Sequence, residues 1–186
     1  MSEDTKTVLI IGYGNPGRLD DGLGPALADA LAESGIPGLT IESNYQLTVE
    51  DAAAVAEHDV VVFADASVSG AEPFVFSPLE PESTMSFSSH SVSPGAVLSL
   101  ARDLFDASTR GYVLGIRGYC FDEFGERLSS RARANLDEAL RFLESLLLDK
   151  GLHSSTAECI GCDEWKSVSC VERRVHHGSG TQNPGG

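Results

Sequence analysis

Residues 7–24 read TVLIIGYGNPGRLDDGLG, and this stretch decides the fold. The apolar run 7–11 ends at Gly12 and predicts a buried strand. Asp21 lies where it could cap or lead a helix over residues 23–34. A buried strand, a glycine-rich turn and a helix in succession are typical of the first unit of an α/β fold.

Strand and helix signals continue to alternate after this unit. Apolar runs and helical periodicities, separated by turn residues, indicate the further elements. Strands are predicted over residues 39–42, 60–64, 74–76 (an edge strand) and 112–116, and helices over residues 49–57, 93–107 and 129–148. Strands separated by helices predict a mainly parallel sheet that is covered on both faces.

The composition excludes several classes of partner. The 186 residues carry 28 acidic and 13 basic side chains, which gives a formal net charge of −15. Nucleic acid and anionic membranes both require a basic face, so neither is expected as a partner. No apolar run approaches the roughly 18 residues of a membrane span. The acidic start, MSEDTK, is unlike a secretory signal, and we therefore expect a cytoplasmic protein.

The chain divides near Lys150. Residues 1–150 predict an α/β domain, whereas residues 151–186 are polar, end in a Gly- and Ser-rich run and hold three of the four cysteines. This composition predicts a poorly ordered tail. Its Cys and His side chains could bind zinc, although their spacing is loose for a structural site: Cys159, Cys162, Cys170, His176 and His177. A tail without metal is the favoured alternative.

Residues 12–17 match the dinucleotide-binding pattern G-x-G-x-x-G, but their context argues against a phosphate site. Pro16 removes one backbone N–H from the loop. Asp20 and Asp21 follow where a pyrophosphate would approach the helix N-terminus, and their charges would repel it. The simpler alternative is that the glycines permit a tight turn and the two acids cap the helix.

A second interpretation of the same loop is a metal site. Ligands bind beyond the carboxyl ends of the strands in such sheets. Asp21 follows the first predicted strand, Asp65 ends the strand 60–64, and His90 lies in a polar loop that could reach over the strand ends. Two carboxylates and an imidazole would suit nickel, zinc or iron. The other histidine of the domain, His58, is expected to be a solvated turn residue.

Residues 12–24 (GYGNPGRLDDGLG) resemble the N-terminal signature of the [NiFe]-hydrogenase maturation proteases. Further matches follow in order, and together the resemblance covers about residues 7–148: residues 42–47 with 49–52, residues 63–67 (FADAS), Ser89–His90, residues 115–119 (GIRGY) and a long C-terminal helix. The YQL and GIRGY elements look most like the branch that serves bidirectional, cytoplasmic hydrogenases.

The resemblance implies a three-layer α/β fold of the phosphorylase/hydrolase-like kind, with helices on both faces of a twisted, mainly parallel sheet. It implies an endopeptidase that removes a C-terminal extension from the hydrogenase large-subunit precursor after nickel insertion. Asp21, Asp65 and His90 align with positions that bind metal in the family and engage the nickel of the substrate. Asp20 also matches an acid of the signature.

The chemistry expected from these residues is metal-assisted hydrolysis. The metal would polarise the scissile carbonyl or a water, and Asp20 or Asp21 would act as the general base. The sequence has no G-x-S-x-G elbow and no H-E-x-x-H helix, so it resembles neither a serine hydrolase nor a self-contained zinc protease. Cys120, the one cysteine of residues 1–150, is expected to serve packing.

Two rival functions remain. A nickel-sensing chaperone would hold the large subunit without cutting it, and no residue here is an unambiguous nucleophile that excludes it. The run Gly14-Asn15-Pro16-Gly17 is also similar to the opening turn of peptidyl-tRNA hydrolases. Those enzymes carry a catalytic histidine shortly after the turn, which residues 18–24 lack, and an acidic domain would bind tRNA poorly.

Overall fold

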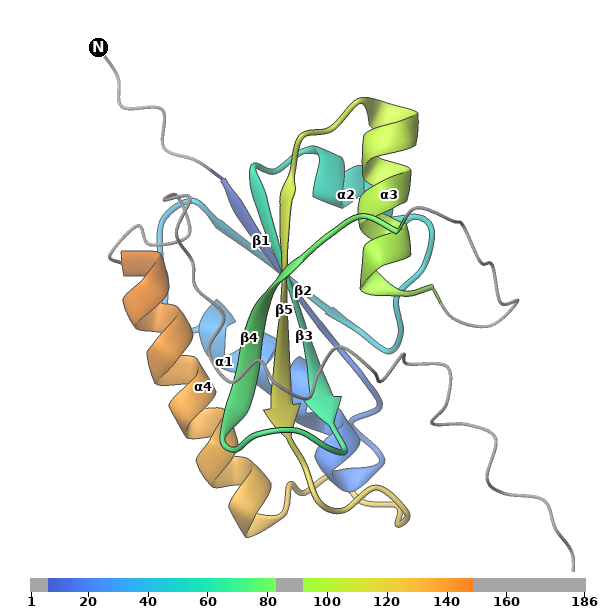
Figure 1. The fold of residues 1–186 in the computed structure, drawn as a ribbon. Helices are drawn as coiled ribbons and strands as arrows, with labels where there is room; N and C mark the ends of the chain where they lie inside the picture. Colours follow the sequence, from blue (N-terminus) through green and yellow to red (C-terminus); the bar gives the residue numbers. More distant parts are fainter. Residues whose placement is uncertain (1–6, 83–91, 149–186) are drawn as a thin grey trace, which may run out of the picture.

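The structure is a computed structural model that describes residues 7–82 and 92–148. Its five strands form one sheet in the order β2-β1-β3-β5-β4 (Figure 1). The strands are β1 (Val8–Tyr13), β2 (Leu39–Asn44), β3 (Val60–Ser67), β4 (Phe74–Leu79) and β5 (Arg110–Arg117). The helices are η1 (Leu19–Gly22, a 3₁₀ turn), α1 (Leu23–Ala32), α2 (Asp51–Ala56), α3 (Pro94–Phe105) and α4 (Ser130–Leu148).

Four strands are parallel, and the fifth, β4, pairs antiparallel with β5 at one edge of the sheet. One hydrophobic cluster joins α1 and α4 to one face, where Leu27 and Leu136 are buried. A second cluster joins α2 and α3 to the other face, where Val55 and Val97 are buried. Figure 1 shows the two helix pairs on opposite sides of the twisted sheet. The predicted three-layer, mainly parallel α/β fold is therefore confirmed.

The predicted strands are confirmed at their positions, but the strands of the structure are longer than predicted. The central strand β3 is buried along all eight residues and continues to Ser67, so Asp65 lies inside the strand and not after it. Helix α3 begins as predicted, because the Ser93 hydroxyl accepts a hydrogen bond from the N–H of Ala96 and Pro94 occupies the first turn.

Two local predictions are wrong. Gly22 is the N-cap of α1 and makes no side-chain hydrogen bond, so Asp21 is not the cap; it leads into the helix as part of η1, the alternative that the sequence left open. His58 is half-buried rather than solvated: its Nδ1 lies 2.7 Å from the carbonyl oxygen of Ala54 and its Nε2 lies 2.7 Å from the hydroxyl of Thr40. It ties α2 to β2 at the end of the sheet where β3 begins.

Other predictions fall outside the described residues. They concern His90 and the tail with its candidate zinc ligands. Of the helices that are described, none has both the length and the apolar composition that crossing a membrane requires.

Candidate metal and catalytic site

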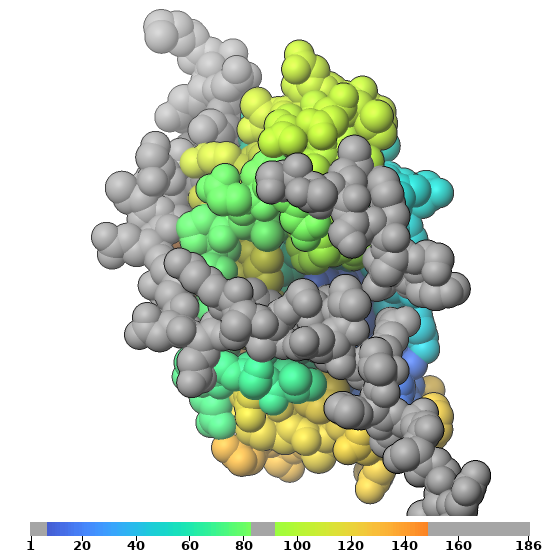
Figure 2. Space-filling model, turned by 45° about the vertical axis from the view of Figure 1, so that its right-hand side comes forward, coloured from blue at the N-terminus to red at the C-terminus, as the bar shows by residue number. Residues whose placement is uncertain are grey.

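The loops that follow β1, β3 and β5 meet at the carboxyl edge of the sheet. The N–H of Leu19 donates to the carbonyl of Gly125 at 2.8 Å, and the N–H of Gly125 donates to the carbonyl of Gly17 at 2.9 Å. The N–H of Gly118 donates to the carbonyl of Ser67 at 2.9 Å. Figure 1 shows the ends of β3 and β5 side by side, and Figure 2 shows the green and yellow segments that follow them in contact at this end of the molecule. In open α/β sheets this edge is where ligands bind.

Helix α1 starts in direct contact with two strands, and Gly24 makes this possible. A Cβ atom at Gly24 would lie 2.3 Å from the carbonyl oxygen of Tyr13 and 2.5 Å from that of Ala64. The missing side chain lets the helix close on β1 and β3. Asp21, just before the helix, is thereby brought to the strand in which Asp65 follows Ala64.

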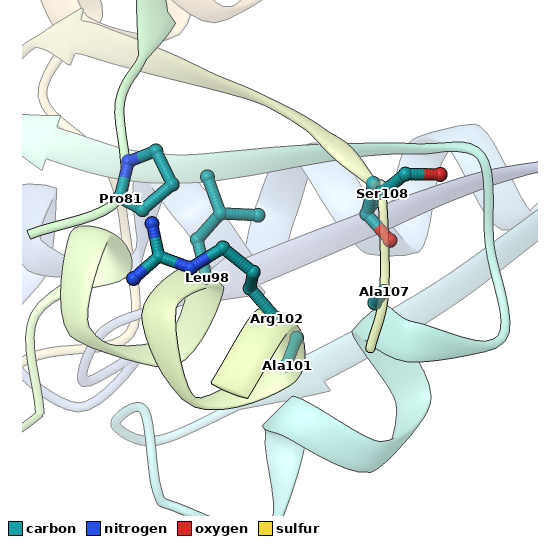
Figure 3. Close-up of a pocket in the computed structure, with 7 residues that line it drawn as sticks. Pro81, Leu98, Ala101, Arg102, Ala107 and Ser108 are labelled. Carbon is teal, nitrogen blue, oxygen red and sulfur yellow. The ribbon is translucent and has the colours of Figure 1, made fainter. Parts of the chain in front are cut away.

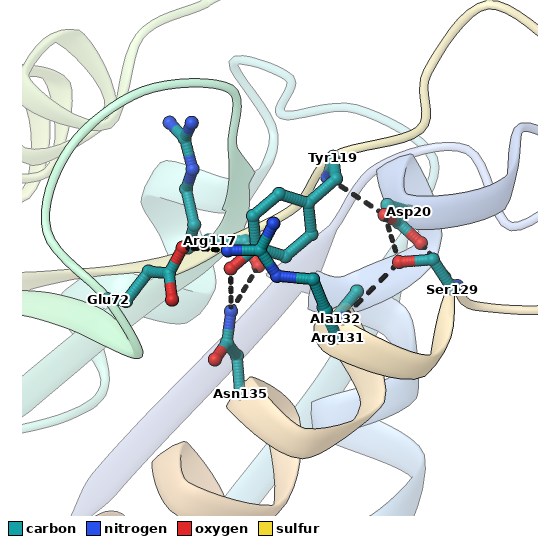
Figure 4. Close-up of polar contacts among 8 residues, drawn as sticks. All are labelled: Asp20, Glu72, Arg117, Tyr119, Ser129, Arg131, Ala132 and Asn135. Carbon is teal, nitrogen blue, oxygen red and sulfur yellow. Dashed lines mark hydrogen bonds and ion pairs between the residues drawn. The ribbon is translucent and has the colours of Figure 1, made fainter.

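Asp20 is fully buried and its carboxylate is saturated with hydrogen bonds (Figure 4). Oδ2 accepts from the N–H groups of Tyr119 and Cys120 at 2.8 and 2.9 Å and from the Ser129 hydroxyl at 2.8 Å. Oδ1 accepts from the N–H of Ser129 at 2.7 Å. Burial raises the pKa of Asp20, but these hydrogen bonds outweigh it and hold the pKa below its ordinary value. This environment favours the ionised carboxylate, which joins the signature loop to the loop after β5.

Asp21 has a different environment. Its side chain is half-buried, and Oδ2 accepts one hydrogen bond, from the N–H of Asn15 at 3.1 Å. Within the described part of the chain no hydrogen bond reaches Oδ1, so this oxygen is available to a ligand. Leu19 helps to separate the two acids, because its φ of 48° lies in the left-handed region that a bulky residue rarely adopts. Asp20 turns toward the loop after β5, and Asp21 turns toward the loop after β1.

Asp65 lies on β3 next to the signature loop. Ala64 pairs with Gly12 of β1, and Asp65 is the next residue along the strand. It is buried, and the N–H of Ala66 donates to its Oδ1 at 2.7 Å. Strand alternation places Asp65 on the same side of the sheet as Phe63, the side that α2 and α3 cover.

The structure thus brings two of the three predicted metal ligands to one edge of the sheet. Asp21 lies in the loop after β1 and Asp65 near the end of the neighbouring strand β3, and His90 is outside the described residues. Across residues 7–82 and 92–148, no three His, Cys, Asp or Glu side chains gather closely enough to hold a metal ion. The chemistry of the predicted set, two carboxylates and an imidazole, suits a transition metal.

The N–H groups of the glycine-rich loop donate hydrogen bonds to acceptors within the protein, which supports the expectation that the loop does not bind a phosphate. All four N–H groups described here donate within the protein: Gly14 to the carbonyl of Asn44, Asn15 to Asp21, Gly17 to the side chain of Asn15, and Arg18 to the carbonyl of Asn15. A phosphate would have to compete with these bonds.

A cluster that the sequence analysis missed surrounds Tyr119, just after β5 (Figure 4). The guanidinium carbons of Arg131 and Arg117 lie 4.1 and 5.5 Å from the centre of its ring. The Asn135 side-chain amide donates to the Tyr119 hydroxyl at 2.9 Å and to the carbonyl of Arg117 at 2.8 Å. The GIRGY stretch was the available signal, but its partners on α4 lie too far along the chain to be inferred from it.

Cys120 is exposed, so the prediction that it serves packing is wrong. Its N–H group, which donates to Asp20, is the part of this residue that the site uses.

A separate hollow of about 210 Å³ lies at the other end of the molecule (Figure 3). It is bounded by residues of α3 and the approach to β5, including Leu98, Arg102 and Thr109. The Thr109 hydroxyl donates to the carbonyls of Val55 and His58, which come before β3. This hollow therefore does not belong to the site at the carboxyl edge.

No family model and no curated protein sequence matches the chain. Solved structures do. The [NiFe] hydrogenase maturation protease HycI from Thermococcus kodakarensis KOD1 is 23% identical, with a TM-score of 0.62 over 78% of this chain and 95% of that one. The hydrogenase maturating endopeptidase HybD from E. coli is 21% identical, with a TM-score of 0.63 over 78% and 94%. At these identities the likeness shows a shared fold.

Proposed function

We propose that this chain, which has the fold of the [NiFe]-hydrogenase maturation proteases, is an endopeptidase that trims the C-terminus of a hydrogenase large-subunit precursor once nickel has been inserted. The observation that carries the proposal is the position of Asp21. A carboxylate with an oxygen available to a ligand lies at the ligand-binding edge of this fold, beside the strand that holds Asp65.

The proposed recognition step uses nickel that arrives with the substrate. Asp21, Asp65 and His90 would supply oxygen and nitrogen ligands to that ion, which the precursor holds. A precursor without nickel would then lack the group that joins it to this site. Cleavage would be confined to large subunits that have already received their metal.

The proposed hydrolysis needs a polarised carbonyl and a base. The substrate's nickel would polarise the scissile carbonyl or a water, and the water would add to the carbonyl carbon while the amine leaves with a proton. Asp21 is the better base of the two acids, because its Oδ1 is available, whereas Asp20 already accepts four hydrogen bonds. We assign Asp20 to positioning.

Single substitutions of the three proposed ligands test this assignment. Asp21→Asn, Asp65→Asn and His90→Ala should each lower the cleavage rate of a nickel-loaded precursor by about 100-fold or more. Asp122→Asn is the matched control, because it neutralises an exposed carboxylate of the loop after β5. Full cleavage by His90→Ala would overturn the ligand set.

The same assay distinguishes the proposed protease from a chaperone that holds the precursor without cutting it. In that case the unchanged protein would bind the precursor stably and leave its mass unaltered.

A further inference from the structure

The side chain of Arg117 is half-buried, and its guanidinium forms no ion pair with the part of the chain that the structure describes. Its Nε and Nη1 atoms are buried and make no hydrogen bond, and none of the ion pairs formed by the described residues includes it. Burying donors of a charged group without acceptors costs free energy. A ligand would reach this guanidinium through Nη2, which is not among the buried atoms, and an acceptor there would neutralise the charge that the group spreads over its three nitrogens.

Arg131 provides an internal comparison (Figure 4). It stacks on the same Tyr119 ring, but its Nη2 lies 2.7 Å from a carboxylate oxygen of Glu72, and its side chain is 69% exposed. Arg117 thus differs from Arg131, because no carboxylate of residues 7–82 or 92–148 pairs with it. In Figure 4 the Arg117 guanidinium points away from Glu72 and from Asn135.

The rest of Arg117 is held firmly in place. Its N–H donates to the carbonyl of Pro73 at 3.1 Å, and its own carbonyl accepts from Asn135. The Tyr119 ring lies 5.5 Å from its guanidinium carbon, and Asn135 also fixes the Tyr119 hydroxyl. The backbone of Arg117 is therefore fixed on both sides, while its guanidinium has no ion-pair partner among the described residues, an arrangement suited to binding.

Arg117 lies beside the proposed cleavage site. It pairs with Ser67 across β3 and β5, while Asp65 pairs with Gly115 two residues earlier. Strand spacing and rise place the Cα atoms of Arg117 and Asp65 about 8 Å apart. Strand alternation puts both side chains on the same side of the sheet. A peptide bound at Asp65 would therefore pass within reach of the guanidinium.

We propose that Arg117 is a carboxylate-binding site that takes an Asp or Glu side chain of the precursor peptide next to the cleaved bond. The inference rests on the proposed function and deepens it. A carboxylate is the ligand because its oxygen accepts a charge-assisted hydrogen bond from a guanidinium nitrogen, as a Glu72 oxygen does from Nη2 of Arg131 at 2.7 Å. The charge of Arg117 gives an acidic segment a local attraction that the net charge of −15 otherwise opposes.

The first experiment needs no hydrogenase. The ¹⁵N-labelled full chain is titrated with sodium acetate at constant ionic strength, and the arginine Nε–H signals are followed by NMR. The Arg117 signal should shift saturably, while the Arg131 signal should not. A linear or absent response at Arg117 would overturn the carboxylate site.

The second experiment measures steady-state cleavage of a nickel-loaded precursor by Arg117→Gln, Arg117→Lys and the control Arg141→Gln. Arg117→Gln should raise KM by at least about tenfold with kcat changed far less, the pattern of lost substrate binding. Arg117→Lys should recover part of the loss, since it keeps the charge. Arg141→Gln should stay within about twofold of the unchanged protein, because its ion pair with Glu138 is exposed on α4 and contributes little.

A double-substitution cycle identifies the partner. Acidic residues of the precursor near the cut are changed to amides one at a time, and one such change should raise KM as Arg117→Gln does, with no further increase when both are combined. Additive effects at every acidic position would overturn the pairing. If the unchanged protein cleaves nothing, the proposed function fails, and the acetate titration still decides whether Arg117 binds carboxylates.

Discussion

At the scale of single residues, the adjacent acids Asp20 and Asp21 have different environments, and we assign them different roles. Asp20 is buried and accepts four hydrogen bonds from the loop after β5. Asp21 is half-buried and accepts one. In the sequence the two acids look equivalent. The left-handed backbone of Leu19, just before them, helps to point their side chains toward different loops.

Substituting each acid by its amide should separate stability from activity. Asp20→Asn should lower the free energy of unfolding by about 3 kcal/mol, because an amide nitrogen would then face buried donors. Asp21→Asn should change it by less than about 1 kcal/mol, because an amide oxygen can still accept from Asn15. Urea denaturation measures both. Equal losses of stability in the two variants would contradict the assignment of Asp20 to positioning.

The stability contributed by Asp20 should also depend on pH. Its pKa is lowered on folding, so its contribution is complete above the ordinary Asp pKa of about 4 and is lost as pH falls below it. The difference in unfolding free energy between the unchanged protein and Asp20→Asn should be constant from pH 7 to about pH 5 and shrink toward pH 3. A difference that grows on acidification would show that the pKa is raised.

The roles of these residues could be predicted only in part. The acidic pair, Asp65 and the glycine turn were visible in the sequence. The partners of Asp20 were not, since Tyr119 and Ser129 lie about a hundred residues further along the chain and come close only after the sheet has formed. The environment of the Arg117 guanidinium could not be predicted for the same reason.

At the scale of elements, the contact between α1 and the sheet shapes the site. Gly24 has no room for a side chain, since the carbonyl oxygens of Tyr13 and Ala64 lie where its Cβ would be. Apolar strands and the Ser93-Pro94 helix start were predictable because their signals are local. The η1 turn and the absence of a cap on α1 were not, because loop contacts override capping propensity.

A methyl group at Gly24 should push the helix off the strands. Gly24→Ala should lower the free energy of unfolding by about 3 kcal/mol, because backbone atoms have to move. Gly17→Ala in the same loop is the control: its Cβ would meet only the side-chain oxygen of Asn15, at 3.2 Å, and should change stability by less than about 1 kcal/mol. Similar unfolding midpoints in urea for the two variants would refute the close-contact argument.

At the scale of the whole molecule, the described helices cover both faces of the sheet. The two hydrophobic clusters are built from residues between Val8 and Leu147, and Leu148 at the end of α4 is 68% exposed. The α/β class and the mainly parallel sheet followed from the alternation of strands and helices along the chain. The contacts between the loops could not be predicted in this way, because they form only once the strands have assembled and the carboxyl edge of the sheet exists.

A chain ending at Lys150 should therefore fold by itself. Its unfolding free energy should equal that of the full chain within about 1 kcal/mol, as for distant independent parts. Its cleavage of a nickel-loaded precursor should also be unchanged. Circular dichroism with urea and a cleavage assay measure the two properties. Loss of either one would assign residues 151–186 to the working domain.

The most direct test of the central claim is the mass of a hydrogenase large-subunit precursor incubated with and without this protein, in nickel-loaded and nickel-free forms. We expect the loaded precursor to lose a short C-terminal peptide only when the protein is present, and the nickel-free precursor to keep its full mass. An unchanged mass in the loaded form, or equal cleavage of both forms, would contradict the account.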